Sequence, residues 1–250
     1  MNFNSKISII TVVYNGETTI ERTIQSVLNQ SFSNIEYIII DGYSKDSTLN
    51  IIKKYQERIA FWISEPDNGL YDAMNKGLNK ASGDYVCFLN SGDSLYSNET
   101  LEKAFGELTY LPDIVYGETI IIDSDGNELG LRRLKAPETL SWKSFKDGML
   151  VCHQSIYIKR SITEPYSLKY KISADFEWVL KALKKAQTIY NSHLVLSLFL
   201  DGGLNKKNIR RALTERFKIM VAYYGLFPVL VNHFLIGTRF LWFWIRNRRF

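Results

Sequence analysis

Residues 8–42 read SIITVVYNGETTIERTIQSVLNQSFSNIEYIIIDG, and this stretch decides the fold class. It opens with an apolar, β-branched run that ends at Asn15-Gly16, which predicts a strand followed by a turn. Apolar side chains then recur at helical spacing over 19–28, and a second unbroken apolar run at 36–40 ends at Asp41-Gly42. The order strand, helix, strand predicts parallel strands joined by a covering helix.

The same alternation continues along the chain and predicts an α/β fold with a mostly parallel central sheet flanked by helices. Ligands of such sheets bind beyond the carboxyl ends of the strands, which is where polar residues gather in this sequence. The expected ligand loops are Tyr14-Asn15, Asp41-Gly42, 65–69 and 90–93. The other expected elements are helices at 47–55, 71–80, 98–107 and 174–185, strands at 61–64, 84–89, 114–118, 119–123 and 154–158, a hairpin turn at Asp125-Gly126, and helical structure from 208 onward.

Composition limits the class of protein. The chain has 250 residues, 46% of them hydrophobic and 23% charged, which is typical of a globular protein with a large core. Cys87 and Cys152 are the two cysteines, too few for a disulfide framework or a zinc cluster, so we expect a reducing compartment and no structural metal. No signal peptide is predicted at the N-terminus. The net charge of +5 favours anionic partners.

Three polar segments are candidates for chemistry, and each also has an ordinary structural interpretation. Asp41 can accept hydrogen bonds from a base or ribose, or can belong to a plain turn in which Asp46 or Ser47 caps the next helix. Asn90-Ser91-Gly92-Asp93 can present a carboxylate to a divalent cation, or can be a tight turn. The absence of G-x-G-x-x-G and G-x-x-x-x-G-K-[ST] patterns disfavours Rossmann dinucleotide and P-loop chemistry.

A helix predicted from Ala174 carries two acids in its first turns, Asp175 and Glu177. Either carboxylate can be a general base for a hydroxyl group, or can merely complement the helix dipole. His153-Gln154 lies at the entrance of a predicted strand, where it can contact a substrate or be structural. These residue types alone leave the alternatives open.

In their order and spacing these segments resemble the family 2 glycosyltransferases with the GT-A fold, the nucleotide-diphospho-sugar transferase fold. The resemblance covers roughly residues 6–205 and is carried by residues 8–32, by EYIIIDGYSKDST at 36–48 and by SEPDNGLYDAMNKGLNKASGDYVCFLNSGDSLY at 64–96. The third segment is similar to bacterial transferases of colanic-acid, exopolysaccharide and O-antigen biosynthesis. The resemblance implies one transferase domain at 1–205, with a nucleotide-sugar half at 1–115 and an acceptor half at 116–205.

The resemblance also implies roles for individual residues. Asp175 matches the catalytic base, and Asp93 matches the last acid of the D-x-D motif that holds Mn²⁺ or Mg²⁺. That motif reads Ser91-Gly92-Asp93 here, so its first acid is missing and one carboxylate would share the cation with the diphosphate. The implied donor-binding residues are Thr11, Tyr14, Asn15, Asp41, Asp67 and Asn75, and the implied acceptor-binding residues are His153, Gln154, Gly202 and Gly203.

The segment 206–250 is expected to be helical and to associate with a membrane. Apolar residues between 226 and 245 are interrupted by Pro228, Asn232, His233 and Arg239, so a transmembrane span is not expected. One helical stripe is apolar, and the end of the chain is basic, which suits a helix lying on an anionic membrane surface. The alternative is a helix packed on the transferase domain or on a second copy of the chain.

The resemblance therefore implies an inverting glycosyltransferase of the hexosyl-transferring type. It would move a sugar from a nucleotide-diphosphate donor to a polyprenyl-linked or oligosaccharide acceptor, in exopolysaccharide, capsule or O-antigen assembly, at the cytoplasmic face of the plasma membrane. An alternative is a non-catalytic nucleotide- or carbohydrate-binding protein on a degenerate transferase fold. Homo-oligomers are compatible with the sequence, and nucleic-acid binding is not expected because the basic residues alternate with Leu, Trp and Phe.

Overall fold

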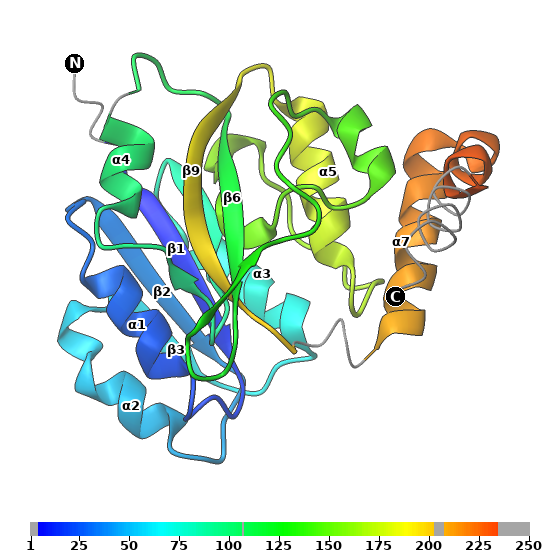
Figure 1. The fold of residues 1–250 in the computed structure, drawn as a ribbon. Coiled ribbons are helices and arrows are strands. Elements are labelled where there is room, and N and C mark those ends of the chain that lie inside the picture. Colours follow the sequence, from blue (N-terminus) through cyan, green and yellow to red (C-terminus); the bar gives the residue numbers. More distant parts are fainter. Residues whose placement is uncertain (1–4, 107, 203–207, 235–250) are drawn as a thin grey trace.

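A single twisted sheet with helices on both faces forms the body of the protein in the computed structural model, which describes residues 5–106, 108–202 and 208–234 (Figure 1). The strands are β1 (Ile7–Val13), β2 (Ile35–Asp41), β3 (Phe61–Ser64), β4 (Tyr85–Phe88), β5 (Ser94–Leu95), β6 (Ile114–Ile122), β7 (Glu128–Leu131), β8 (Ile156–Lys159) and β9 (Ile189–Leu200). The helices are α1 (Ile20–Leu28), α2 (Thr48–Lys54), α3 (Leu70–Lys80), α4 (Thr100–Gly106), α5 (Ala174–Lys185) and α7 (Ile209–Tyr224). The described residues also form the short 3₁₀ helices η1 (Gln56–Arg58), η2 (Trp142–Asp147), η3 (His153–Ser155) and η4 (Arg160–Ile162).

The strand order is β3-β2-β1-β4-β8-β6-β9-β5, with β7 paired to β6. The half from β3 to β4 is entirely parallel, as the unbroken apolar runs predict. In the other half β8 is antiparallel to both β4 and β6, whereas β9 runs parallel to β6. The α/β class is therefore confirmed, with a mixed second half.

Two predictions for the second half of the sheet need correction. Residues Ile114–Ile122 form one long strand, β6, instead of two, and the hairpin at Asp125-Gly126 joins it to β7. The long strand β9 is not among the predicted elements. Its sequence, IYNSHLVLSLFL, is interrupted by polar residues, and His193 adopts a left-handed backbone with φ of 56°. This irregularity hides the alternation that identifies a strand.

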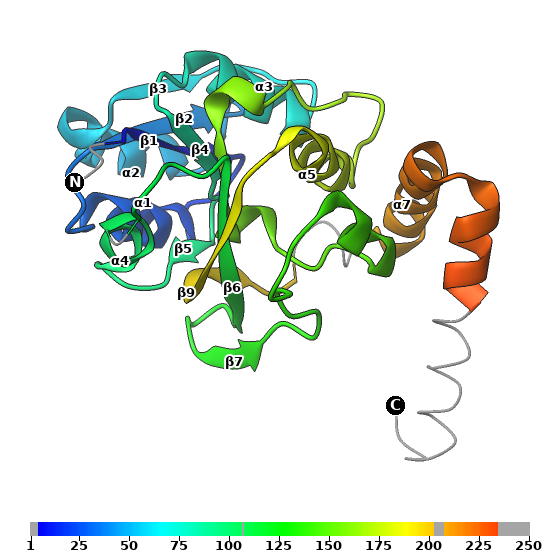
Figure 2. The same cartoon turned by 90° about the horizontal axis from the view of Figure 1, so that it is seen from above.

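The two faces of the sheet bury separate hydrophobic cores. Alternate residues of β1 point to opposite faces: Ile10 packs with α3 and α5, and Ile9 packs with α1, α2 and α4. Figure 2 shows α1 and α4 on one side of the strands and α3 and α5 on the other. Because both faces are covered, the ligands of the first half of the sheet are restricted to the ends of its strands.

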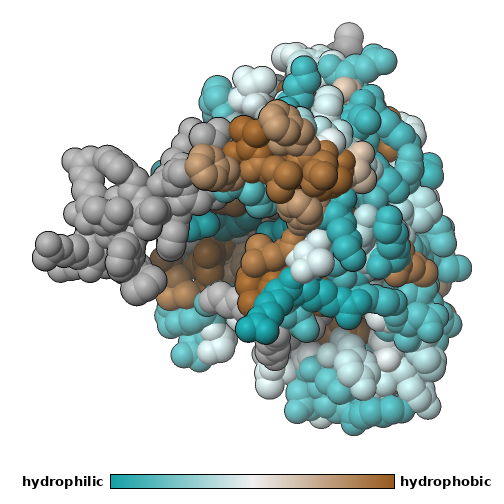
Figure 3. All heavy atoms as spheres, turned by 90° about the vertical axis from the view of Figure 1, so that its right-hand side faces the viewer, coloured by the Kyte–Doolittle hydropathy of each residue, from teal (hydrophilic) through white to brown (hydrophobic). Residues whose placement is uncertain are grey.

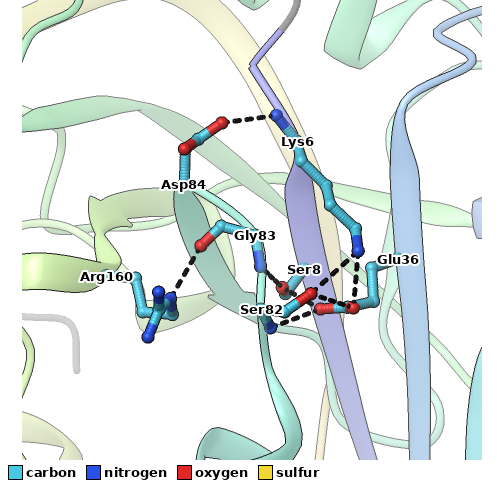
Figure 4. A network of polar contacts seen from close by, with 7 residues as sticks. All are labelled: Lys6, Ser8, Glu36, Ser82, Gly83, Asp84 and Arg160. Atoms are coloured by element: carbon cyan, nitrogen blue, oxygen red, sulfur yellow. Dashed lines mark hydrogen bonds and ion pairs between the residues drawn. The ribbon is translucent and has the colours of Figure 1, made fainter.

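At the amino ends of the parallel strands a polar network holds β1, β2 and the approach to β4 together (Figure 4). The Glu36 carboxylate accepts hydrogen bonds from Lys6 Nζ at 2.8 Å, Ser8 Oγ at 2.6 Å, and both the backbone N–H and hydroxyl of Ser82 at 2.7 and 2.6 Å. These bonds lower the pKa of Glu36 to about 2 even though burial opposes the shift. This end of the sheet is therefore closed by internal polar contacts.

The last described part of the chain forms two helical segments, α7 on the α5 side and a second segment farther out (Figures 1 and 2). Ile219 and Met220 of α7 belong to the same core as α5, and residues 226–234 continue as a second helical segment after Gly225. No helix among residues 5–106, 108–202 and 208–234 combines the length and apolar character needed to cross a membrane. The part of the predicted apolar stripe that follows Phe234 lies outside the described residues.

Candidate functional site

A cavity of about 410 Å³ opens beyond the carboxyl ends of β1 and β4, at the opposite end of the sheet from the Glu36 network. Residues from both halves of the chain form its wall. The lining residues are Val12, Val13, Tyr14, Asn15, Gly16, Thr19, Leu70, Tyr71, Met74, Asn90, Ser91, Asp93, His153, Gln154, Lys171, Ile172, Asp175, Phe199, Leu200, Asp201 and Gly202. Its position is the one expected for a ligand site in a parallel sheet.

The turn after β4 brings Asp93 to the cavity. The N–H of Asp93 donates to the carbonyl of Asn90 at 3.0 Å, and Gly92 has a φ of 100°, a conformation that glycine adopts without strain. Asp93 is only 4% exposed, and its carboxylate accepts from Gln154 Nε2 at 2.8 Å and from the N–H of Leu200 at 3.0 Å. The segment is therefore a tight turn and also presents an acid to the cavity.

Burial raises the pKa of Asp93 to about 6, and the hydrogen bonds from Gln154 and Leu200 only partly offset this effect. A bound cation would favour the ionised form of such a carboxylate. The same wall also holds the buried oxygens Oε1 of Gln154 and Oδ1 of Asn90, neither of which has a hydrogen-bond partner among the described residues. One carboxylate with nearby neutral oxygens fits a hard divalent cation that takes its other ligands from a phosphate group. The described residues contain no group of three or more His, Cys, Asp or Glu side chains arranged for a metal.

Asp175 reaches the cavity from the first turn of α5. Tyr71 Oη donates to the carbonyl of Ile172 at 2.8 Å and lies 3.2 Å from Oδ1 of Asp175. Burial alone would raise the pKa of Asp175, but the hydrogen bond from His153 and the positive charge of Arg216 hold that pKa below its ordinary value. The group is therefore an ionised carboxylate near neutral pH, able to accept a proton inside a largely apolar cavity.

Two adjacent residues of η3 connect these two acids. His153 Nδ1 lies 3.4 Å from Oδ2 of Asp175, while the neighbouring Gln154 holds Asp93. His153 Nε2 is 3.2 Å from Nδ2 of Asn90. Because an amide nitrogen donates, Nε2 accepts this bond and the imidazole proton is on Nδ1, which faces Asp175. Both residues line the cavity, and their polar groups contact carboxylates. The predicted contact with an acceptor stays a prediction.

The predicted donor-binding residues divide into two groups. Tyr14 and Asn15 line the cavity, and the Tyr14 ring is 64% exposed, which leaves it open to a planar ligand. Thr11 is fully buried and donates to the carbonyl of Leu89 at 2.7 Å, so it lies beneath the site. Asp41 is also buried, and its carboxylate accepts from Ser44 and from Ser64 Oγ at 2.6 Å.

Asp67 and Asn75 lie beside the cavity and do not line it. A Cβ atom at position 42 would collide with the Asp67 carboxylate, so Gly42 allows the loop after β3 to approach the loop after β2. Asn75 exchanges two hydrogen bonds with the backbone of Tyr166, at 2.6 and 2.9 Å, and thereby ties α3 to the acceptor half. Among the predicted acceptor residues, Gly202 lines the cavity and Gly203 lies outside the described residues.

Other lining residues were not predicted as site residues. Tyr71 and Lys171 reach the cavity only because α3 and the loop before α5 pack together. No motif or spacing in the sequence predicts that these two residues line a cavity. Leu200 could have been suspected if β9 had been recognised, because its N–H is at the carboxyl end of that strand and donates to Asp93.

The family of the chain follows from comparison with known proteins. The model described as glycosyl transferase family 2 matches residues 8–164, which run from the second residue of β1 past the end of β8 and include the Asp93 turn. The chain belongs to this family. It is thus a transferase enzyme, and the GT-A-type α/β fold expected from the sequence is confirmed by structural neighbours.

Relatives of this family 2 glycosyltransferase include mycobacterial proteins. An uncharacterized glycosyltransferase of Mycobacterium tuberculosis (strain CDC 1551 / Oshkosh) is 33% identical over 185 residues, which cover 70% of this chain and 68% of the relative. A protein of Mycobacterium bovis (strain BCG / Pasteur 1173P2) named PGL/p-HBAD biosynthesis glycosyltransferase is 28% identical over 222 residues, which cover 84% and 82% of the two chains.

Solved structures support the fold at lower sequence identity. The S. aureus TarS 1–349 complex with UDP-GlcNAc has a TM-score of 0.70 and 20% identity, and the match covers 91% of this chain and 66% of that one. The mannosyltransferase PcManGT of Pyrobaculum calidifontis, in complex with GDP-Man and Mn²⁺, has a TM-score of 0.58 and 15% identity, covering 88% and 65%. The chain thus spans less than two thirds of these crystallised chains.

Proposed function

We propose that this protein moves a sugar, with inversion, from a nucleoside diphosphate donor to a lipid-linked or growing polysaccharide acceptor. The observation that carries the proposal is the pair of carboxylates, Asp93 and Asp175, that line one cavity and are joined through His153-Gln154. Such a transferase needs a base for the acceptor hydroxyl and a place for the diphosphate. UDP-, GDP- and dTDP-sugars are the candidate donors, and the nucleotide-sugar complexes of the structural neighbours support this class.

In the proposed reaction Asp175 accepts the proton of the acceptor hydroxyl. The acceptor oxygen forms a bond to the anomeric carbon on the face opposite the diphosphate, and the bond from that carbon to the diphosphate oxygen breaks. The electron pair of the broken bond leaves with the nucleoside diphosphate. A single displacement inverts the configuration at the anomeric carbon. The contacts of His153 and Tyr71 support this role, because they orient the carboxylate and keep it ionised.

The donor would occupy the side of the cavity formed by β1 and the Asp93 turn. Tyr14 and Asn15 would contact the base and ribose, with Asp41 and Asp67 supporting the loops behind them. Asp93 and the free oxygen of Gln154 would hold Mn²⁺ or Mg²⁺. When bound, such an ion neutralises negative charge on the leaving diphosphate.

A membrane surface is the proposed site of action, with the protein peripheral at the inner face of the plasma membrane. The support comes from an apolar ridge, defined as Leu226, Phe227, Leu230, Val231 and Phe234, whose side chains are 43–77% exposed. Figure 3, which faces the α7 side, shows hydrophobic side chains gathered on this surface. Arg210, Arg211 and Lys218 are exposed on α7, which favours an anionic lipid surface.

The test of the proposed function is a donor screen followed by turnover. Nucleotide sugars are first ranked by the increase in unfolding temperature that they cause with and without Mn²⁺, because a ligand of the native state stabilises it. The best donor is then incubated with a polyprenyl diphosphate-linked acceptor, and release of nucleoside diphosphate and the anomeric configuration of the product are measured. Release with an inverted product supports the proposal. Binding without release under all conditions would instead assign a binding protein.

A further inference from the structure

A buried acid of α7 binds the loop that precedes Asp175. Glu215 on α7 is 7% exposed. Its carboxylate accepts hydrogen bonds from three consecutive backbone N–H groups, those of Lys171 at 3.1 Å, Ile172 at 2.9 Å and Ser173 at 3.1 Å. Arg211 Nε, one turn earlier on α7, donates to the same carboxylate at 2.9 Å. One carboxylate therefore binds three consecutive backbone N–H groups of this loop.

The loop held by Glu215 is part of the candidate active site. Lys171 and Ile172 line the cavity, and the carbonyl of Ile172 accepts from Tyr71 Oη, which also lies 3.2 Å from Asp175. Ser173 is the residue from which α5 begins, and Asp175 follows in the first turn of that helix. A shift of residues 171–173 would consequently move both the cavity wall and the carboxylate.

Local capping does not replace this contact. The Ser173 side chain makes no capping bond to α5, and its hydroxyl donates instead to the carbonyl of Ala212 on α7 at 3.2 Å. Burial opposes the ionised form of Glu215, yet the three N–H groups and Arg211 lower its pKa below the ordinary value. The start of α5 is thus held by side-chain contacts from α7, a helix that follows the residues 8–164 matched by the family.

We infer that Glu215 is a positioning residue of the acceptor half, through which α7 fixes the orientation of Asp175. The inference rests on the proposed function, because its kinetic readout is sugar transfer. It assigns α7 a role in turnover that is separate from any contact with lipid. Accordingly, the loss of Glu215 lowers kcat while the donor side of the cavity stays intact.

The test compares Glu215→Gln with wild type in the full chain. The neutral amide keeps the size of the side chain but offers one acceptor oxygen to three N–H groups. We expect kcat to fall about 10- to 100-fold, since small misplacements of a reacting group cost this much. The donor KM and the nucleotide-induced thermal shift should change less than about twofold, and hydrogen exchange of the amides at 171–173 should accelerate. Glu164→Gln is the matched control, because Glu164 pairs on the surface with Lys181 and Lys185.

Each outcome is decisive. Unchanged kcat and unchanged exchange at 171–173 in Glu215→Gln would overturn the inference, and so would an equal loss in Glu164→Gln. If Glu215→Gln does not fold, Ser173→Ala removes the second bond to α7, and the inference then requires a lower kcat at unchanged donor KM. An absence of turnover in the wild type would contradict the proposed function, whereas the exchange measurement still reports whether Glu215 orders the loop.

Discussion

His153 Nδ1 lies 3.4 Å from Oδ2 of Asp175, and both side chains are about nine-tenths buried where they meet the cavity. The second acid of the same helix, Glu177, points elsewhere and lies 3.9 Å from Lys181. From the sequence either acid was a candidate base. The geometry favours Asp175, because among these two it alone lines the cavity and has a partner that fixes its orientation.

The first prediction concerns the base itself. Asp175→Asn removes the proton acceptor while preserving the shape of the side chain, so we expect transfer to fall about 10²- to 10⁴-fold, the usual contribution of general base catalysis. Donor binding, followed by nucleotide-induced thermal stabilisation, should remain. Glu177→Gln is the control and should keep at least about half of the activity. Wild-type turnover in Asp175→Asn would exclude this residue as the base.

The second prediction concerns the partner of the base. Without His153 the Asp175 carboxylate loses the hydrogen bond that most strongly favours its ionised form. The pKa of Asp175 should therefore rise in His153→Asn. Because the base must be ionised to act, the acidic limb of the kcat profile should move to higher pH. The carboxylate also loses the contact that orients it, so kcat on the plateau of the profile should fall about tenfold or more.

His193→Asn serves as the matched control for that profile. His193 lies in β9 with a side chain that is 62% exposed, and its φ of 56° is one that Asn accepts readily. The same chemical change at this position should leave the acidic limb in place. If the limb also stays in place in His153→Asn, the His153 contact does not tune the base.

The sequence predicts the first half of the fold well for a physical reason. The strands β1, β2 and β4 are buried on both faces, so their apolar runs are unbroken and easily recognised. β9 is different, because its pairing with β6 includes register shifts and a left-handed residue. A strand of this kind is specified by its neighbours more than by its own alternation.

The candidate site also has a part that the sequence predicts and a part that it does not. Asp93 and Asp175 can be proposed from residue type, position and resemblance. The link between them through His153 and Gln154 cannot, because it joins side chains that only the folded sheet brings together. The same limit applies to Asn75, whose amide binds the Tyr166 backbone, a contact that depends on how α3 packs against the acceptor half.

The third prediction tests the cation. Asp93→Asn retains a hydrogen-bond acceptor for Leu200 but removes the charge that would attract Mn²⁺. We expect the Mn²⁺ concentration for half-maximal activity to rise at least about tenfold, and the additional thermal stabilisation by Mn²⁺ with nucleotide to disappear. Asp125→Asn, in the exposed hairpin turn, should change neither quantity. An unaltered Mn²⁺ response in Asp93→Asn would show that the ion is held elsewhere.

The fourth prediction concerns stability at the other end of the sheet (Figure 4). The pKa of Glu36 is about 2, below its ordinary value of 4.5, so its contribution to folding is present above pH 4.5 and is lost as the pH falls toward 2. Glu36→Gln should lower the free energy of unfolding by about 1–3 kcal/mol at pH 7, and the difference from wild type should shrink near pH 2. Urea unfolding at several pH values measures this, with the exposed Glu57→Gln as the control. A difference independent of pH would contradict the assignment.

The last prediction addresses the membrane surface. Phe227 and Phe234 are 77% and 71% exposed, so replacing both with Ser removes apolar area from the ridge without opening the core. If the ridge enters the lipid interface, each replacement should cost about 1.5 kcal/mol, roughly tenfold in affinity for vesicles containing phosphatidylglycerol. The unfolding temperature and turnover on a short water-soluble acceptor should not change. Leu129→Ser with Leu131→Ser, on exposed β7, is the control for general loss of apolar surface. If the ridge enters the lipid, its variant must lose more vesicle affinity than the β7 variant does. Equal vesicle binding by the two variants would therefore mean that the ridge packs against protein.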